Sequence, residues 1–195
     1  MKKTKKSGAA LLIDIIIEIC VLIMVTCFLM YYTGYFKNGV VLYTGVTAFT
    51  IVYQLGLRLE FGVITTKFKE KLSTKQFLFK ERKFEQKLYK FLKVKKWKSK
   101  ALTYDPDAFN LKKNTKEQVL QTMLKSELDH WINELISLST LLFAFIWGEF
   151  AIFLVTCILA MLFDAQFILI QRFNRPRIER LINREKIIKT KKKTA

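Results

Sequence analysis

The chain has 195 residues, of which 51% are hydrophobic, and a formal net charge of +18. Its apolar residues stand in long unbroken blocks rather than at amphipathic spacing, which disfavours a soluble domain and indicates a membrane protein. So many basic residues would also suit nucleic acid, but the sequence contains no groove-reading motif, and we expect no nucleic-acid partner.

Two apolar blocks near the start of the chain predict a transmembrane hairpin. They cover residues 8–32 and 39–59, and only the short TGYFKN turn separates them. Each block is long enough to cross about 30 Å of hydrocarbon. The first is too long for a removed signal peptide and has no small-residue cleavage site. Because backbone groups in lipid must be satisfied internally, both blocks should be helices.

Two further apolar blocks, residues 131–148 and 150–170, predict a second hairpin with almost nothing between its helices. The fold class that follows is an all-α membrane protein with four transmembrane helices, arranged as hairpins over residues 8–59 and 131–170. Between the hairpins lies a basic segment of residues 60–130.

Lysine and arginine gather in three places: residues 1–7, the segment 60–130 and the tail 171–195. The two hairpin tips contain only Lys37 between them. By the positive-inside rule, both termini and the middle segment should be cytoplasmic. The positive charge would then face anionic lipid head groups, so membrane lipid is an expected partner.

The middle segment has the composition of a basic amphipathic helix that lies in the membrane interface. Its apolar positions are Phe77, Phe79, Phe84, Leu88, Phe91 and Leu92, and its basic positions are Lys80, Lys83, Lys87 and Lys90. Such a helix can serve only as an anchor or can bind lipid, and the pattern leaves both open.

Further along the segment, Pro106 breaks the helical pattern. A new helical pattern begins near residue 115, with Asn114 or Thr115 as its N-cap.

The three cysteines, Cys20, Cys27 and Cys157, all lie in apolar blocks, without metal-ligand spacing and without histidine pairs. We interpret them as small core residues. No metal site and no bound cofactor is expected.

Ionisable residues inside the apolar blocks share one depth, in the half of the bilayer that should face the cytoplasm. These residues are Asp14, Glu18, Arg58, His130, Glu134 and Asp164. Each charge in hydrocarbon costs roughly 2.5–3.5 kcal/mol, so the group implies either interhelical ion pairs, for example between Asp14 and Arg58, or a shared polar cavity.

His130 is the only histidine. On a helix, Glu127, His130 and Glu134 share one face, so either carboxylate could orient the imidazole. An imidazole held in this way can remove a proton from a hydroxyl near neutral pH. A histidine beside Trp131 at a membrane boundary can equally be an ordinary interfacial residue.

The stretch QRFNRPRIERLI, residues 171–182, switches from lysine to arginine in a chain that otherwise prefers lysine. Guanidinium groups suit bidentate phosphate and carboxylate recognition, so the stretch can bind a substrate, although it can also be a positive anchor. Pro176 is expected to end the helix near Asn174.

Three segments in this order, residues 94–102 (VKKWKSKAL), 126–132 (SELDHWI) and 168–182 (ILIQRFNRPRIERLI), give the chain its family resemblance. The chain resembles the glycosyl-4,4'-diaponeurosporenoate acyltransferases, small bacterial membrane proteins, over roughly residues 58–182. The positions that match the family are Trp97, Lys98, Glu127, His130, Trp131, Gln171, Arg172, Asn174, Arg175, Pro176 and Arg177. We infer from their chemistry that all of these except Pro176 take part in substrate binding or catalysis.

The resemblance also implies a reaction, in which a fatty acyl group is esterified onto a sugar hydroxyl of a glycosylated carotenoid or another glycolipid. Acyl-CoA or an acyl carrier protein would be the donor, in a bacterial cell membrane. His130 would act as the base, while Arg172, Arg175, Arg177 and Asn174 would hold the donor. Asp129 departs from the family pattern and leaves the acceptor open. A non-catalytic accessory subunit that binds lipid or a protein partner is the alternative.

Overall fold

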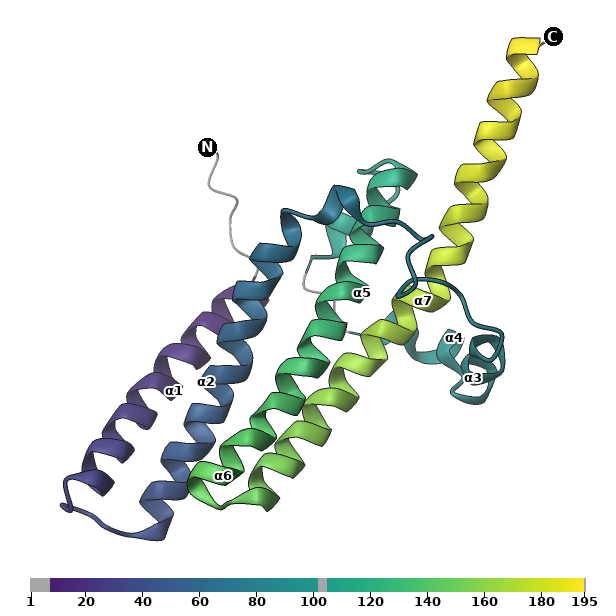
Figure 1. The fold of residues 1–195 in the computed structure, drawn as a ribbon. Helices are drawn as coiled ribbons and strands as arrows, with labels where there is room; N and C mark the ends of the chain where they lie inside the picture. The colour runs from purple at the N-terminus through teal and green to yellow at the C-terminus, as the bar shows by residue number, and fades with distance from the viewer. Residues whose placement is uncertain (1–7, 102–104, 195) are drawn as a thin grey trace, which may run out of the picture. The chain divides into compact units, whose positions relative to one another are not determined.

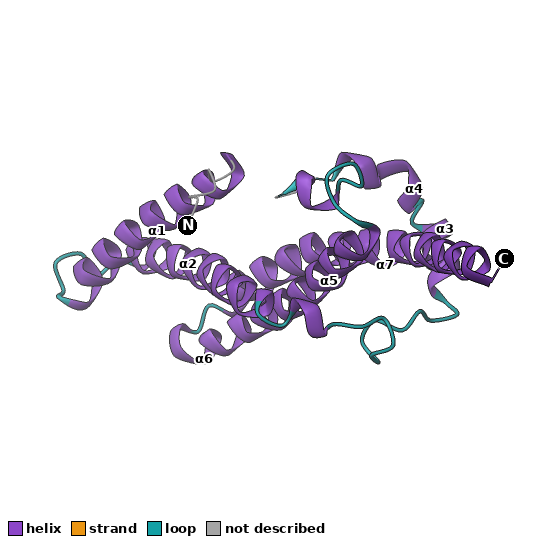
Figure 2. Cartoon of the chain, turned by 90° about the horizontal axis from the view of Figure 1, so that it is seen from above, coloured by secondary structure: helices purple, strands orange, loops and turns teal. Residues whose placement is uncertain are grey.

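The computed structural model describes residues 8–101 and 105–194, and within these ranges the protein is helical without any β-strand (Figure 2). Four helices are long and apolar enough to cross a membrane, at Leu11–Tyr32, Gly39–Thr66, Lys116–Trp147 and Phe150–Lys192. The predicted all-α membrane fold with four spans is therefore confirmed. The predicted basic N-terminus, residues 1–7, lies outside the described residues.

The chain divides into two compact units. The hairpin unit comprises Met1–Gly62 and Ile132–Leu162, and the polar unit comprises Val63–Trp131 and Phe163–Ala195.

In the hairpin unit, α1 (Gly8–Tyr32) and α2 (Gly39–Thr66) run side by side in opposite directions (Figure 1). Gly34 has a φ of +80°, a left-handed conformation that glycine adopts without steric cost, so the chain can reverse there. Asn38 then caps α2, because its Oδ1 accepts from the backbone N–H of Val40 at 2.9 Å. The first hairpin thus forms as its apolar blocks predict.

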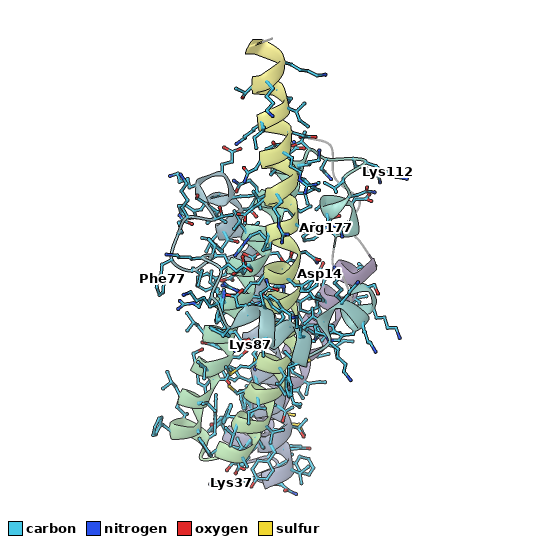
Figure 3. The ribbon with its side chains drawn as sticks, turned by 90° about the vertical axis from the view of Figure 1, so that its right-hand side faces the viewer. Asp14, Lys37, Phe77, Lys87, Lys112 and Arg177 are labelled. Atoms are coloured by element: carbon cyan, nitrogen blue, oxygen red, sulfur yellow. The ribbon has the colours of Figure 1, made fainter. Side chains whose placement is uncertain are left out.

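Figure 3 shows Lys37 at the loop end of this hairpin and Asp14 toward the opposite end of α1. The basic residue of the hairpin tip is thereby separated from Asp14, one of the two acidic residues of α1.

The second hairpin tip ends α5 (Lys116–Ser139) through two short elements, η4 (Thr140–Phe143) and α6 (Ala144–Trp147). Gly148 closes this end with a φ of +77°, and its N–H donates to the carbonyl of Ala144 at 2.8 Å. The chain then enters α7 (Phe150–Thr194) at once. As predicted, almost no loop separates the two helices.

An aromatic cluster packs the hairpin unit. Phe28 stacks on Trp147 at a centroid distance of 5.7 Å, and Phe49 meets Phe143 edge to face at 4.8 Å. Trp147 also stacks on Phe153, a fully buried side chain, at 6.3 Å. Because aromatic pairs contribute about 0.5–1.5 kcal/mol beyond their burial, this cluster fixes the tips of both hairpins within the unit.

In the polar unit, the chain between α2 and α5 is made of short helical pieces. They are η1 (Lys69–Lys71), α3 (Glu85–Phe91), α4 (Val94–Trp97), η2 (Lys98–Lys100) and η3 (Pro106–Phe109). The amphipathic helix is therefore shorter than the pattern of residues 77–92 predicts. Its apolar positions also differ in burial, since Phe79 is 2% exposed and Phe77 is 78% exposed and points outward (Figure 3).

The start of α5 follows its sequence signal. Thr115 Oγ1 accepts from the N–H of Gln118 at 3.2 Å, and Gln118 Oε1 accepts from the N–H of Thr115 at 2.9 Å. This reciprocal pair is a capping box. Of the two predicted caps, the structure therefore selects Thr115.

The prediction that Pro176 ends its helix near Asn174 is wrong, because α7 continues through this proline. An interior proline costs about 3 kcal/mol through a lost hydrogen bond and a steric clash. Burial on its C-terminal side opposes that cost: Ile178 and Ile182 are part of one apolar cluster with Val119 and Met123 of α5. Tertiary packing therefore overrides the local signal.

Candidate functional site

The centre of the polar unit is a network of two arginines and two glutamates. Glu127 of α5 is fully buried, and one of its oxygens accepts from Arg172 at 2.6 Å while the other accepts from Arg175. Arg172 also donates to Glu85 of α3 at 2.5 Å. Since two positive and two negative groups meet, the network is neutral overall.

The same arginines hold the loop that precedes α3. Arg172 donates to the carbonyls of Leu78 at 2.8 Å and Lys80 at 2.9 Å, and Arg175 donates to the carbonyl of Phe79. The Arg175 guanidinium also lies over the Phe79 ring, 5.6 Å from its centroid. Because these three carbonyls bind guanidinium groups instead of helical N–H groups, the predicted amphipathic helix is replaced here by a turn.

Glu85 completes the network on the side of α3. Its oxygens accept from the Tyr89 hydroxyl at 2.6 Å and from the N–H of Arg82 at 3.0 Å, in addition to Arg172. Burial opposes the charge of Glu85, but the hydrogen bonds from Arg172, Tyr89 and Arg82 outweigh it and lower the pKa of this carboxyl. Burial and the neighbouring Glu85 raise the pKa of Tyr89, so its hydroxyl stays a donor.

Arg172 and Arg175 are thus bound to groups of the chain itself. Glu127 was predicted to orient His130, but the contacts of Glu127 do not match this role. Both Glu127 oxygens are taken by the arginines. The geometry gives these residues a structural role, and substrate binding by the two arginines stays a prediction.

A second site in the polar unit joins α5 to α7. The His130 Nδ1 lies 2.7 Å from Asp164 Oδ1, and Asp164 is 1% exposed. The carboxylate accepts from Nδ1, which fixes the tautomer with its proton on that nitrogen. The imidazole of His130 therefore binds Asp164 and not the predicted Glu127.

The plane of the imidazole is also fixed. Its ring stacks on Phe167 at 4.7 Å and an interplanar angle of 8°, and Phe167 meets Phe163 edge to face at 5.1 Å. No hydrogen bond within the described ranges uses Nε2 of His130, which is about one-fifth exposed. The arrangement leaves Nε2 in a fixed orientation and without a hydrogen bond among the described residues.

Asp129, the acidic residue just before the histidine, does not belong to this pair. Its oxygens accept from Thr65 at 2.5 Å and from Lys125 at 2.6 Å. The charge that departs from the family pattern is therefore compensated locally, one turn back along α5.

A cationic site lies where the η2 segment meets α7. Lys98 donates to Asn174 Oδ1 at 2.5 Å, and its ammonium lies 4.7 Å from the centroid of the Phe173 ring. Desolvation, followed by the positive charges of Arg177 and Lys95, lowers the pKa of Lys98. The predicted residues Lys98, Asn174 and Arg177 are thereby brought together.

The other predicted site residues have separate environments. Trp97 donates to the carbonyl of Leu92 at 2.9 Å, and Gln171 donates to Ser126 at 3.3 Å. Trp131 is 38% exposed on α5. Their predicted part in substrate binding stays a prediction.

Among the polar residues of the spans, Arg58 donates to Ser137 at 3.0 Å in the hairpin unit, and Glu134 is buried. Asp14 is half-buried on α1, and Glu18 is exposed there. The predicted shared cavity stays a prediction, as does the orienting role of Glu134.

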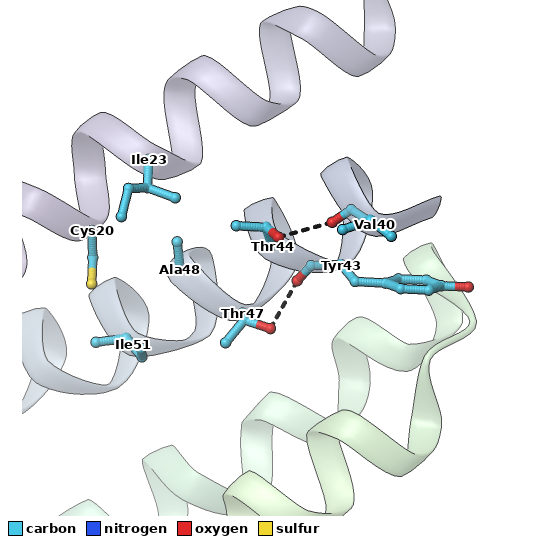
Figure 4. A pocket seen from close by; sticks show the side chains of 8 residues that line it. All are labelled: Cys20, Ile23, Val40, Tyr43, Thr44, Thr47, Ala48 and Ile51. Carbon is cyan, nitrogen blue, oxygen red and sulfur yellow. Dashed lines mark hydrogen bonds between the residues drawn. The ribbon is translucent and has the colours of Figure 1, made fainter. Parts of the chain in front are cut away.

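The hairpin unit has a hollow of about 380 Å³ between α1 and α2 (Figure 4). Its lining residues are Cys20, Ile23, Val40, Tyr43, Thr44, Thr47, Ala48 and Ile51. The hydroxyls of Thr44 and Thr47 donate to backbone carbonyls one turn earlier, at 2.8 Å in both cases. The two threonine hydroxyls are therefore already used as donors within α2, and most of the other lining side chains offer hydrocarbon contacts.

The cysteines and acidic residues form no metal site in the part of the chain that the structure describes. Cys157 is buried, as a core residue should be, while Cys20 and Cys27 are only half-buried.

Sequence reasoning missed the part of Glu85 in the arginine network and the pairing of Asp164 with His130. The two partners of that pair are 34 positions apart in the chain. Asp164 was visible as a charge within an apolar block, but no spacing rule connects residues on two different helices.

Four long apolar helices define this chain as a multi-pass membrane protein, and its polar unit contains a histidine and aspartate pair with one ring nitrogen open. The chain belongs to the glycosyl-4,4'-diaponeurosporenoate acyltransferase family, whose sequence profile matches residues 75–184, more than half of its length. The matched region includes the arginine network, the His130 and Asp164 pair and the cationic site. No curated protein and no solved structure matches the chain.

Proposed function

We propose that the protein transfers a fatty acyl group from an activated thioester to a sugar hydroxyl of a glycosylated lipid, with a carotenoid glycoside as the acceptor that the family name indicates. The observation that carries the proposal is the pair of His130 and Asp164, in which Nδ1 is held at 2.7 Å and Nε2 is open.

The chemistry needs a base for the hydroxyl proton. Nε2 of His130 takes the proton as the sugar oxygen attacks the thioester carbonyl, and the new C–O bond gives a tetrahedral intermediate. As this intermediate collapses, the C–S bond breaks, and the proton passes from the imidazolium to the leaving thiolate. The products are one sugar ester and one free thiol, and the histidine returns to its neutral form.

Asp164 has two effects in this scheme. Its hydrogen bond keeps the imidazole in the tautomer that presents a basic Nε2, and its negative charge stabilises the imidazolium that forms. Stacking on Phe167 keeps the ring in plane with that bond. Because two contacts already define the ring position, the site is preorganised for proton transfer.

The donor is an acyl-CoA or an acyl carrier protein, and the reaction takes place at the cytoplasmic leaflet of a bacterial cell membrane. The basic residues of the polar unit support a cytoplasmic location of the site, because positively charged segments are retained in the cytoplasm. The same positive potential would attract phosphate-bearing or acidic donors to the site.

The test compares the total lipids of cells that make a glycosylated carotenoid acid and express either the intact chain or His130→Ala, at matched protein levels. Asp129→Asn is the matched control, because it removes a charge beside the histidine without touching the pair. Mass spectrometry should show an acceptor that gains one acyl mass with the intact chain and with the control. His130→Ala should reduce the rate by about 10² to 10⁴.

If His130→Ala forms as much ester as the intact chain, His130 is not the base of the reaction. If no acylated product forms with any variant, the reading of a non-catalytic accessory subunit is favoured instead.

A further inference from the structure

Three cations come together on the polar unit without a carboxylate to neutralise them. Lys95 lies in the first turn of α4, Lys98 begins η2, and Arg177 projects from α7 (Figure 3). Lys98 binds Asn174 at 2.5 Å, and Arg177 follows Asn174 by three residues on α7, about one helical turn. The positive charges of Arg177 and Lys95 both act on the Lys98 ammonium. In the described part of the chain, none of the three forms an ion pair.

Such a cluster is unfavourable by itself, because like charges repel and Lys98 is partly withdrawn from water. Elsewhere in the polar unit, the chain compensates its buried cations: Arg172 and Arg175 have Glu85 and Glu127 as partners. In the cationic site, Lys98 is half-buried and Lys95 and Arg177 are exposed, so an anion from outside the chain can reach them and would remove the repulsion.

The donors at this site are also positioned. An ammonium has three N–H donors, and Lys98 directs one to Asn174 Oδ1, which leaves two. The contact with Phe173 restrains the lysine chain, and Phe173 is itself fixed edge to face on Tyr89 at 5.4 Å. The Asn174 amide nitrogen takes part in none of the hydrogen bonds of the described residues and can donate to the same ligand.

We propose that Lys98, Asn174 and Arg177 form a phosphate-binding subsite, with Lys95 as a further cation at its edge. The bound group is a phosphate carried either by the acyl donor or by a lipid head group. A phosphate accepts several hydrogen bonds at once and suits a guanidinium beside an ammonium.

The donor assignment rests on the proposed function and on the position of the subsite along α7. Asp164 and Arg177 are 13 residues apart on one helix, which corresponds to about 20 Å at 1.5 Å per residue. The pantetheine arm of a CoA or carrier-protein thioester separates its sulfur from a phosphate and is extended in form. If the arm runs along α7 toward Asp164, a phosphate at Arg177 brings the thioester toward the pair of His130 and Asp164.

The experiment measures binding without turnover. Intact protein in nanodiscs of neutral phosphatidylcholine is titrated with adenosine 3',5'-bisphosphate, which has phosphates but no acyl group. Lys98→Glu and Arg177→Glu should each weaken binding tenfold or more. Lys112→Glu, a charge reversal of an exposed lysine outside the cluster, should leave binding unchanged. For the donor assignment, the KM for acyl-CoA should rise in the two variants while kcat changes little.

A second arm replaces part of the neutral lipid with phosphatidylglycerol. If the bisphosphate does not bind, but phosphatidylglycerol raises the Tm of the intact protein and not that of Lys98→Glu, the phosphate comes from a lipid head group. The subsite is refuted if neither ligand distinguishes Lys98→Glu and Arg177→Glu from Lys112→Glu. Because the bisphosphate assay needs no acyl transfer, failure of the subsite and failure of the proposed reaction are distinguishable.

Discussion

The polar unit contains two sets of charged residues that look alike in the sequence and differ in what their donors bind. In the arginine network, Arg172 and Arg175 direct their N–H groups to Glu127, Glu85 and three backbone carbonyls. In the cationic site, Lys98 has a single hydrogen bond, and no acid lies against it. Cations that bind the chain itself therefore differ from cations that can bind a ligand in whether N–H donors remain without a partner. The sequence motif does not show this difference.

The largest expected effect is on the arginine network. Glu127→Gln leaves two buried guanidinium groups without their shared carboxylate, and breaking a buried pair in this way costs about 3–5 kcal/mol. The variant should lose most of its thermal stability in detergent, as measured by the unfolding of purified protein.

Glu117→Gln is the matched control, because it makes the same chemical change on an exposed position of α5. Equal stability of the two variants would show that the network does not hold the polar unit together.

The next largest effect is expected at the pair of His130 and Asp164, where, unlike in the arginine network, one ring nitrogen has no partner among the described residues. Asp164→Asn removes a hydrogen bond to a charged group, which is worth about 1.5–3 kcal/mol. The rate of acyl transfer should therefore fall about 10- to 150-fold. Asp129→Asn should stay within a few-fold of the intact protein in the same assay, and a matching loss in both variants would indicate a general charge effect.

A pH titration tests whether Glu85 is part of the network. Its folded pKa lies below the ordinary value of 4.5, so its ionised form stabilises the folded protein above pH 4.5. This contribution is lost as the pH falls through the lowered folded pKa. The difference in Tm between the intact protein and Glu85→Gln should be constant near neutral pH and should shrink below pH 4.5. A difference that stays constant down to pH 3 would contradict the assignment.

The smallest expected effect concerns the turn that leads to the cationic site. Lys93 has a φ of +51°, a left-handed conformation that is unfavourable for residues with a side chain. Lys93→Gly should relieve this strain and raise the stability by less than about 1 kcal/mol, because glycine also loses more entropy on folding. Thermal unfolding measures the gain, and phosphate binding should be unchanged; a lower Tm would argue against strain at this turn.

The parts of the fold that depend on local sequence were predictable. The apolar blocks gave the four spans, because a helix in lipid needs a long apolar run. The start of α5 was predicted with Asn114 or Thr115 as its cap, and the structure shows Thr115 in a capping box with Gln118. Local rules failed where distant groups intervene: Pro176 lies inside α7, and the carbonyls of residues 78–80 bind arginines instead of extending a helix.

The site divides in the same way. His130 was identified as the only histidine, at the start of an apolar block. Its partner, Asp164, lies on another helix, so the spacing along α5 suggested Glu127 and Glu134 instead. The arginine string was predicted either to bind a substrate or to act as a positive anchor. Its contacts with the chain itself could not be predicted, because they join residues 45 or more positions apart in the sequence.

The central claim, that Nε2 of His130 accepts the hydroxyl proton, is tested most directly by chemical rescue. His130→Gly protein in nanodiscs is supplied with an acyl thioester and a glycosylated carotenoid acid, and ester formation is followed as imidazole is added. We expect a rate at least 10²-fold below that of the intact protein, which rises with the concentration of neutral imidazole, whereas Asp164→Asn is not rescued. An unreduced rate in His130→Gly would show that Nε2 of His130 is not the base.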